Sequence, residues 1–352
     1  MMPMRAPTPH AARVAAGLVL LALLAVAPLT RADGGFMPPY GLDIYEPNQL
    51  ALLRFDAATQ TEDLILHARF QGTAPDFGWV IPVPALPTVE TAEAMLLWEC
   101  AELTAPLYRS RGEFGCVHEE GGYFAAPTGD LDGGVTVYED QELGIYRALT
   151  VGASDAGALA DSLAAWGYLH IGNRARVLAA LQFYVEKSWF FVALKARPES
   201  TGHPHSGYWE GGIDPVHLRF ASAVPVYPLR ISALSATESS EVLIYALAAH
   251  RMTFPRAQTE YANRIDAAER DAIRRDYPRL GEWIEASTYV TKLRRTISPA
   301  AMTDDLVLTR APTDSEFRII HYRDASATVV LLLGVAGILA ARSRRRAPPP
   351  TP

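Results

Sequence analysis

The segment from Asp76 to Pro87 constrains the fold more than any other part of the chain, because bulky apolar residues alternate along it. The first set is Phe77, Trp79, Ile81 and Val83, and it alternates with Gly78, Val80, Pro82 and Pro84. This period of two is typical of a β-strand with one strongly apolar face. Pro82 and Pro84 remove two N–H groups on the same side, so the sequence predicts an edge strand or a strand that ends against a loop.

The composition is that of a folded globular protein whose middle part is acidic. The chain has 352 residues, of which 49% are hydrophobic and 20% charged, enough for one large or two modest cores. Residues 33–324 hold 25 basic and all 39 acidic residues, a net charge of −14. Such a negative charge argues against binding to nucleic acid, because phosphate groups are bound by basic surface residues. It also argues against binding to an anionic lipid surface.

Residues 1–32 have the order of a secretory signal peptide. Arg5 and Arg13 precede an apolar run from Val14 to Leu29, and small residues follow at the −3 and −1 positions before Asp33. This arrangement predicts cleavage that leaves Asp33 as the mature N-terminus. An uncleaved membrane anchor is the alternative.

Residues 325–341 form a second apolar run, which predicts a single C-terminal transmembrane helix. As a helix the run is about 25 Å long, somewhat short for a hydrocarbon core of about 30 Å, and Arg342 can extend it by snorkelling. The basic, Pro-rich tail at residues 342–352 is predicted to be cytoplasmic by the positive-inside rule, which places residues 33–324 outside. A buried C-terminal helix and a cleaved surface-sorting signal are the alternatives.

The two cysteines fit an exported chain. Cys100 and Cys116 are the only pair, and an oxidising compartment favours a disulfide between them. Two buried free thiols are the alternative. A Cys-x-x-Cys redox motif is absent.

Hydrophobic periodicity predicts a mixed α+β fold with mainly antiparallel sheets and packed helices. Residues 33–324 are expected to form the extracytoplasmic domain, as one unit or as two subdomains. We expect strands at 49–55, 62–70, 77–83, 135–138, 145–151, 190–196, 216–220, 226–231 and 241–249. We expect helices at 91–104 with Thr91 as N-cap, at 155–166, at 173–187 and over 261–286 with a break at Pro278. Residues 287–324 are expected to be a mixed tail.

Several separated motifs resemble one bacterial family. They are Asp76–Pro84 (DFGWVIPVP), Glu102–Pro106 (ELTAP), Ala165–Tyr168 (AWGY), Trp189–Lys195 (WFFVALK), Val226–Ser232 (VYPLRIS) and Tyr289–Arg294 (YVTKLR). In this order they resemble the family of domain of unknown function 2330 (DUF2330), over roughly residues 33–310. The resemblance implies an exported or membrane-tethered protein. It implies no activity and no functional residues.

One histidine-rich loop is a candidate zinc site. His203 and His205 form a His-x-His pair, and Glu210, Asp214 and His217 follow. Three or four nitrogen and oxygen ligands of these types bind zinc, although the spacing matches no named signature. A polar loop without metal is the alternative.

The sequence favours a non-enzymatic binding or interaction module of the cell envelope. It contains no nucleophile elbow, phosphate loop or dinucleotide fingerprint. Together with the two ends and the acidic middle, this predicts a single-pass membrane protein that binds an envelope protein or surface ligand without a cofactor. The competing hypothesis is a metal-dependent hydrolase that uses His203, His205 and His217.

Overall fold

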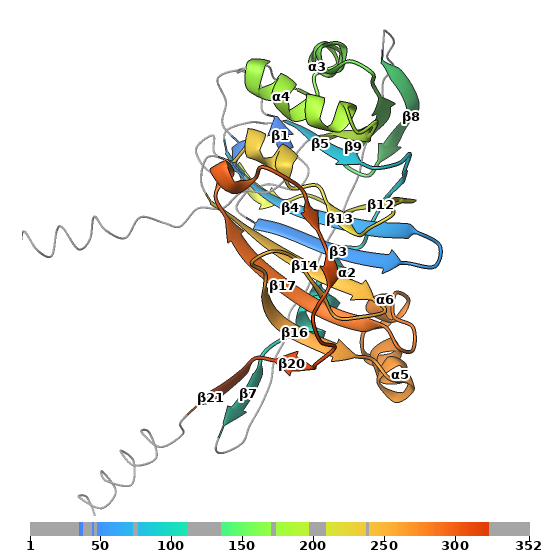
Figure 1. Cartoon of the computed structure of the whole chain (residues 1–352), viewed down its shortest axis with the longest axis vertical. Coiled ribbons are helices and arrows are strands. Elements are labelled where there is room, and N and C mark those ends of the chain that lie inside the picture. The colour runs from blue at the N-terminus through green and yellow to red at the C-terminus, as the bar shows by residue number, and fades with distance from the viewer. Residues whose placement is uncertain are drawn as a thin grey trace, which may run out of the picture.

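The computed structural model describes residues 35–37, 44–45, 48–72, 77–110, 135–169, 174–196, 209–236 and 239–323. Two main sheets pack face to face, and helices cover the outer face of each, so that four layers are stacked (Figure 1). The predicted signal peptide (1–32), transmembrane helix (325–341) and tail (342–352) lie outside the described residues. Within the described ranges, no helix is both long and apolar enough to span a membrane.

The smaller sheet has five antiparallel strands. In order they are β1 (Gly35–Met37), β5 (Phe77–Val83), β10 (Phe190–Ala196), β9 (Tyr146–Gly152) and β8 (Thr136–Leu143). Helices α3 (Ala156–Ala165) and α4 (Arg174–Val185) connect β9 to β10 and cover the outer face. This strand–helix–helix–strand unit confirms the prediction for residues 145–196, and Asp155 caps α3 by accepting a hydrogen bond from the Ala158 N–H at 2.7 Å.

Strand β5 is internal in its first half and lies at an edge in its second. Its residues Gly78 to Val80 pair with β1 on one side and with β10 on the other. Past Val80, only β10 continues beside it among the described strands. Pro82 lies beyond the end of the pairing with β1, so its missing N–H costs no hydrogen bond to that strand. The predicted edge strand is thus correct only for the end that carries the prolines.

The larger sheet has ten strands from both halves of the chain. In order they are β20 (Phe317–Arg318), β16 (Gln258–Arg264), β17 (Tyr289–Ile297), β14 (Ser240–Ala248), β3 (Asn48–Asp56), β4 (Thr61–Gly72), β12 (Val216–Ala221) and β6 (Thr88–Thr91), with β11 (Trp209–Gly212) and β2 (Ile44–Tyr45) also on β4. Only β3 and β14 run parallel within this sheet. The mixed, mainly antiparallel α+β fold is confirmed.

Short elements complete the fold around the larger sheet. Helices α2 (Ala94–Leu103), α5 (Ala267–Asp276) and α6 (Pro278–Gly281) cover its outer face. Three pairs of short strands follow: β13 (Val226–Tyr227) with β18 (Leu306–Val307), β15 (Met252–Thr253) with β19 (Thr309–Arg310), and β7 (Leu107–Ser110) with β21 (Ile320–Arg323). The 3₁₀ helices are η2 (Arg230–Leu234) and η3 (Pro299–Ala301).

Several predicted elements differ from the structure. The expected mixed tail over 287–324 begins with the nine-residue strand β17. The expected helix over 261–286 was wrong at its start, because β16 runs to Arg264 and α5 begins only at Ala267. The expected strand at 226–231 stops at Tyr227 and gives way to η2. Helix α2 begins at Ala94, after Glu93, so Thr91 is not its N-cap.

The alternating residues of β5 face two different cores, as the period of two requires. Phe77, Trp79, Ile81 and Val83 lie in the core that the two sheets share. Val80 lies in the second core, between the smaller sheet and helices α3 and α4. Every residue of β5 is buried, so this strand links two hydrophobic cores.

Gly78 is required because another segment of backbone crosses directly over it. A Cβ atom built on Gly78 would lie 1.7 Å from the carbonyl oxygen of Tyr168. Tyr168 follows Gly167, whose φ of +76° ends α3, and the Tyr168 N–H donates to the Leu163 carbonyl at 2.8 Å. The end of α3 and the middle of β5 are therefore in direct backbone contact.

Replacing Gly78 with alanine should destabilise the protein by about 3 kcal/mol, because two backbones must separate to admit the methyl group. Urea denaturation of the full-length protein measures this change. Gly157→Ala is the matched control, since the Cβ at Gly157 meets only the Asp155 side chain at 3.0 Å and alanine favours helix. Equal unfolding midpoints for Gly78→Ala and wild type would show that the contact is not tight.

Candidate ligand-binding site

The structure places only part of the predicted zinc site. His203 and His205 lie outside the described residues. His217 lies on β12, and its Nε2 atom is 2.9 Å from Asp63 Oδ1 on the neighbouring strand β4. No cluster of three metal-binding side chains occurs in the part of the chain that the structure describes. The zinc hypothesis therefore gains no support at His217.

His217 belongs to a group that we name the Asp63 cluster, which consists of Arg54, Asp63, His217, Arg219 and Trp283. Arg54 donates to Asp63 Oδ2 through Nε at 3.1 Å and Nη2 at 2.8 Å, and Arg219 Nη1 lies 3.1 Å from both carboxylate oxygens. The Arg54 guanidinium lies 4.6 Å from the Trp283 ring centroid, and the His217 ring is 5.2 Å from the same ring. Both Asp63 oxygens are occupied by donors.

The Asp63 carboxylate is held in its ionised form. Its side chain is only 4% exposed, and burial alone would raise its pKa. Hydrogen bonds from His217 and Arg54 outweigh burial and lower the pKa of Asp63 to about 2. The cluster thus contributes to stability at neutral pH, and it offers no free ligand atom on Asp63 for a metal.

The predicted disulfide is not seen at Cys100. Cys100 carries a free thiol on the buried face of α2, and burial raises the pKa of that thiol. Its predicted partner Cys116 lies outside the described residues, so the disulfide stays a prediction. At Cys100 itself the structure agrees with the alternative of a buried free thiol.

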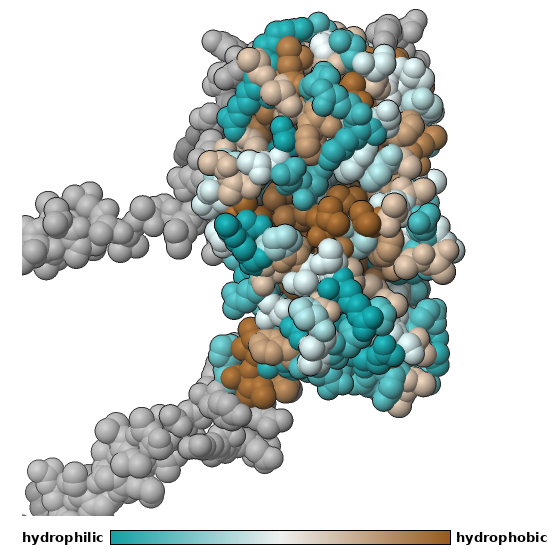
Figure 2. Space-filling view, in the orientation of Figure 1, coloured by the Kyte–Doolittle hydropathy of each residue, from teal (hydrophilic) through white to brown (hydrophobic). Residues whose placement is uncertain are grey.

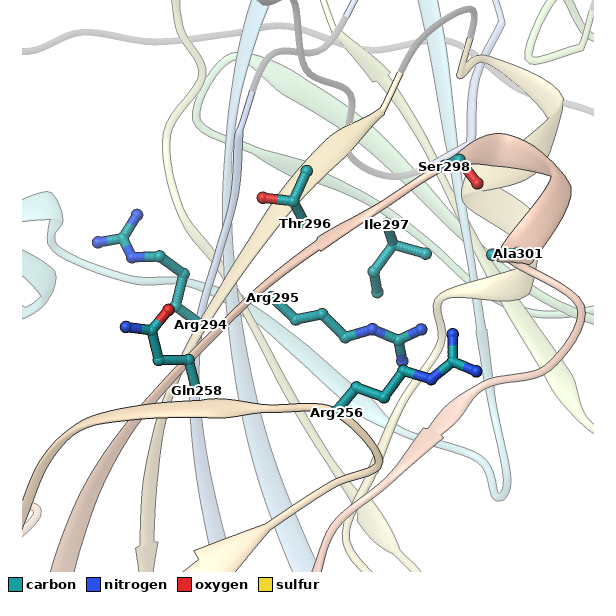
Figure 3. A pocket seen from close by; sticks show the side chains of 8 residues that line it. All are labelled: Arg256, Gln258, Arg294, Arg295, Thr296, Ile297, Ser298 and Ala301. Carbon is teal, nitrogen blue, oxygen red and sulfur yellow. The ribbon is translucent and has the colours of Figure 1, made fainter.

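A candidate binding site lies in a pair of adjoining surface hollows, which we name the arginine pocket. Arginine side chains dominate the smaller hollow, of about 310 Å³ (Figure 3). Its lining residues are Arg256, Gln258, Arg294, Arg295, Thr296, Ile297, Ser298 and Ala301. The larger hollow, of about 480 Å³, shares Arg256, Arg295 and Ala301 with it. These volumes fall in the range of small-molecule sites.

Two arginines converge in the pocket from different elements. Arg295 extends from β17, and Arg256 from the turn that precedes β16; Figure 3 shows their guanidinium groups side by side. The turn is closed by the Ala257 N–H, which donates to the Phe254 carbonyl at 3.0 Å. Arg256 has a φ of +63°, at a position where a turn after proline favours glycine. The backbone of Arg256 is therefore strained at the point where its side chain extends into the pocket.

The converging arginines lack carboxylate partners. Among the described residues neither Arg256 nor Arg295 forms an ion pair, and Arg295 Nη1 donates instead to the Pro255 carbonyl at 3.0 Å. Burial and the charge of Arg256 lower the pKa of Arg295. By contrast, Arg294 points away from them in Figure 3 and pairs with Glu260 and Glu241. The pocket therefore holds two guanidinium groups that have no ion pair within the described part of the chain, and such groups suit an anion.

The larger hollow continues the pocket onto apolar surface. Its apolar lining comes from Leu229, Pro255, Leu306 and Val307. Nearby along the β13–β18 pair, Val307 is 39% exposed, and Val224, just before β13, is 47% exposed. Figure 2 shows hydrophobic surface gathered across the middle of this face, over the region where Figure 1 places β13. A ligand with both an acidic group and an apolar body fits such a lining.

Sequence reasoning missed this pocket because four separate segments build it. They are the turn and start of β16 at residues 254–258, the end of β17, the chain from 298 to 307, and Leu229 just before η2. The one available signal was Pro255-Arg256, an arginine at a turn position that favours glycine. That signal marks a turn and does not reveal which residues surround it.

These features define a class: an α+β protein of two packed main sheets that carries an arginine-lined surface pocket. The chain belongs to the bacterial family described as "Uncharacterized protein conserved in bacteria (DUF2330)", whose family model matches residues 30–309. The resemblance seen in the motifs is thereby confirmed. No curated protein and no solved structure matches the chain. Function must therefore be argued from the site itself.

Replacing Asp63 with asparagine should destabilise the protein by about 2 kcal/mol at pH 7, because the folded-state pKa of Asp63 lies below its ordinary value. A lowered carboxyl pKa stabilises the fold above the ordinary value of 3.8, and this stability is lost as the pH falls toward about 2. The Asp63→Asn variant has no carboxyl group to protonate at this position, so its stability should fall less than that of wild type as the pH is lowered. Thermal melting between pH 2 and 7 measures both effects.

Asp161→Asn is the matched control for Asp63→Asn, since Asp161 forms an exposed pair with Arg174 and its loss should change little. If Asp63→Asn melted as wild type does at pH 7, the cluster would have no part in stability.

Proposed function

We propose that the chain is an exported, membrane-tethered, non-enzymatic protein that captures a small organic anion in the arginine pocket. One observation carries the proposal: Arg256 and Arg295 converge in a hollow where the described residues give neither one an ion pair. Planar guanidinium groups bind carboxylates and phosphates through paired hydrogen bonds. Two positive charges held side by side repel each other, and an anion bound between them relieves that repulsion.

The apolar walls narrow the class of anion. Leu306, Val307 and Leu229 line the larger hollow next to the two arginines. An anion that is charged all over, such as inorganic phosphate, makes no use of these walls. An organic acid with an apolar body buries surface mainly against Val307, the exposed residue among the three, at about 25 cal/mol for each Å² of apolar surface. The proposed ligand is therefore an organic acid.

Export and tethering rest on the two ends of the sequence. The order of charge, apolar run and small residues in 1–32 supports a signal peptide, and the apolar run 325–341 followed by arginines supports a single anchor. In this proposal the domain faces away from the cytoplasm and meets its ligand, or an envelope protein that delivers it, outside the membrane. The exposed Val224 and Val307 offer contact area to such a partner.

The binding test uses the full-length protein in detergent and isothermal titration calorimetry with inorganic phosphate, hexanoate and leucine. At least one organic acid should bind, and both Arg256→Gln and Arg295→Gln should weaken it at least tenfold. Loss of a charge-assisted hydrogen bond is worth about 1.5–3 kcal/mol, which sets this magnitude. Arg275→Gln is the matched control, because Arg275 is an exposed arginine of α5 outside the pocket.

Two results would contradict the binding proposal. The first is the absence of measurable binding for every compound in the panel. The second is an equal loss of affinity in Arg275→Gln, which would show that only the overall charge matters.

Tethering is tested by cell fractionation of the full-length chain and of a chain that ends at residue 324. The full-length chain should sediment with membranes, and the shortened chain should appear in the soluble extracytoplasmic fraction, because residues 325–341 supply the anchor. The intact mass of the purified protein should place its N-terminus at Asp33. Recovery of both chains in the cytoplasmic fraction with Met1 retained would contradict the export proposal.

A further inference from the structure

The larger hollow of the arginine pocket has acidic residues in its wall as well as arginines. Asp304 and Asp305 line it together with Arg256 and Arg295, and no other charged side chain belongs to its described lining. The two positive and two negative charges of the lining sum to zero. An anion binder has no need of acidic residues in its wall, since they repel the ligand.

Asp305 is incompletely paired. Its Oδ1 atom accepts a hydrogen bond from the Tyr184 hydroxyl at 2.7 Å and another from the Arg230 N–H at 3.1 Å. Its Oδ2 atom is covered and has no hydrogen-bond partner among the described residues. A covered carboxylate oxygen without a donor is unfavourable, and native proteins keep few of them. Since the protein covers Oδ2, Asp305 acts on the hollow through its negative charge, and the exposed Asp304 supplies the carboxylate that a ligand can contact.

The surrounding cations do not satisfy Asp305. Lys187 acts on it electrostatically, but the Lys187 ammonium lies over the Phe183 ring, 3.6 Å from the centroid. The Arg230 guanidinium also lies over that ring, at 4.0 Å. Asp304, the neighbour of Asp305, is exposed and adds a second negative charge at the wall.

We infer that the larger hollow binds a zwitterion with an apolar body, namely an apolar amino acid or a short apolar peptide. Arg256 and Arg295 hold the carboxylate, and the ammonium group lies toward Asp304 and Asp305. The apolar body packs against Leu306 and Val307. Each charge of the ligand then meets the opposite charge in the wall, which accounts for both pairs of residues at once. This inference rests on the proposed function and specifies its ligand.

Paired ligands that differ in one charge test the inference on the full-length protein in detergent. Calorimetry compares leucine and leucyl-leucine with N-acetyl-leucine and hexanoate, which keep the carboxylate and lack the ammonium group. At least one of the two zwitterions should bind at least tenfold more tightly than both acids. The tighter zwitterion also separates a free amino acid from a peptide.

Two variants remove the acidic charge without removing the fold. Asp305→Asn keeps an oxygen that accepts from Tyr184 and Arg230, and Asp304→Asn changes an exposed side chain. Asp305→Asn, alone or combined with Asp304→Asn, should reduce the preference for the zwitterion to less than threefold and leave hexanoate binding unweakened. Arg295→Gln should weaken both kinds of ligand. Unchanged melting temperatures show that each variant is folded.

The outcomes separate the two proposals. Equal binding of leucine, leucyl-leucine, N-acetyl-leucine and hexanoate overturns the zwitterion and leaves the organic-acid proposal standing. An unchanged preference in the double variant Asp304→Asn and Asp305→Asn also overturns the zwitterion. No binding of any of the four compounds overturns both.

Discussion

The apolar contact between the two main sheets is the interaction on which the rest of the structure depends. Strand β5 enters this core with its bulky residues, and two buried hydrogen bonds tie β13 to the strands of the larger sheet. The Tyr227 hydroxyl donates to Gln49 Oε1 at 2.6 Å, and the Val226 N–H donates to Glu62 Oε2 at 2.9 Å. These bonds fix β13 to the larger sheet. Because β13 pairs with β18, they also fix the apolar wall of the arginine pocket.

Two buried carboxylates of this fold illustrate the difference between stability and binding. Asp63 receives donors at both oxygens, so its charge is fully compensated within the protein. Asp305 receives donors at one oxygen only. Glu62 in the core likewise receives a donor at Oε2 and has none at Oε1 among the described residues, so an unpaired oxygen alone does not mark a site. What distinguishes Asp305 is its place in the lining of the pocket, whereas the Asp63 cluster belongs to the fold.

Sequence reasoning succeeded where burial imposes a simple period and failed where partners lie far apart in the chain. Strands β3, β4, β5, β9 and β10 were predicted because each is a short, mostly apolar run that is buried on both faces, and helices α3 and α4 because each has an apolar face. Strand β17 was not, since Lys292 and Arg294 interrupt its apolar pattern and their partner Glu260 sits on another strand. The contact between His217 and Asp63 was also missed, because the two residues lie on strands that are far apart in the sequence. His217 was therefore interpreted as a zinc ligand. The pocket was hidden because four segments, far apart in the sequence, build it.

The order of strands in the larger sheet has a consequence for how the chain folds. Strand β17, formed by residues 289–297, lies between β14 and β16, and β3 from the start of the domain lies on the other side of β14. Until β17 is synthesised, β14 and β16 each present an unpaired edge, so the sheet closes only when nearly the whole domain is available. Pairing between such distant segments is slow. Slow folding suits a chain on the proposed export route, because a polypeptide that has not yet folded can still be threaded through a membrane.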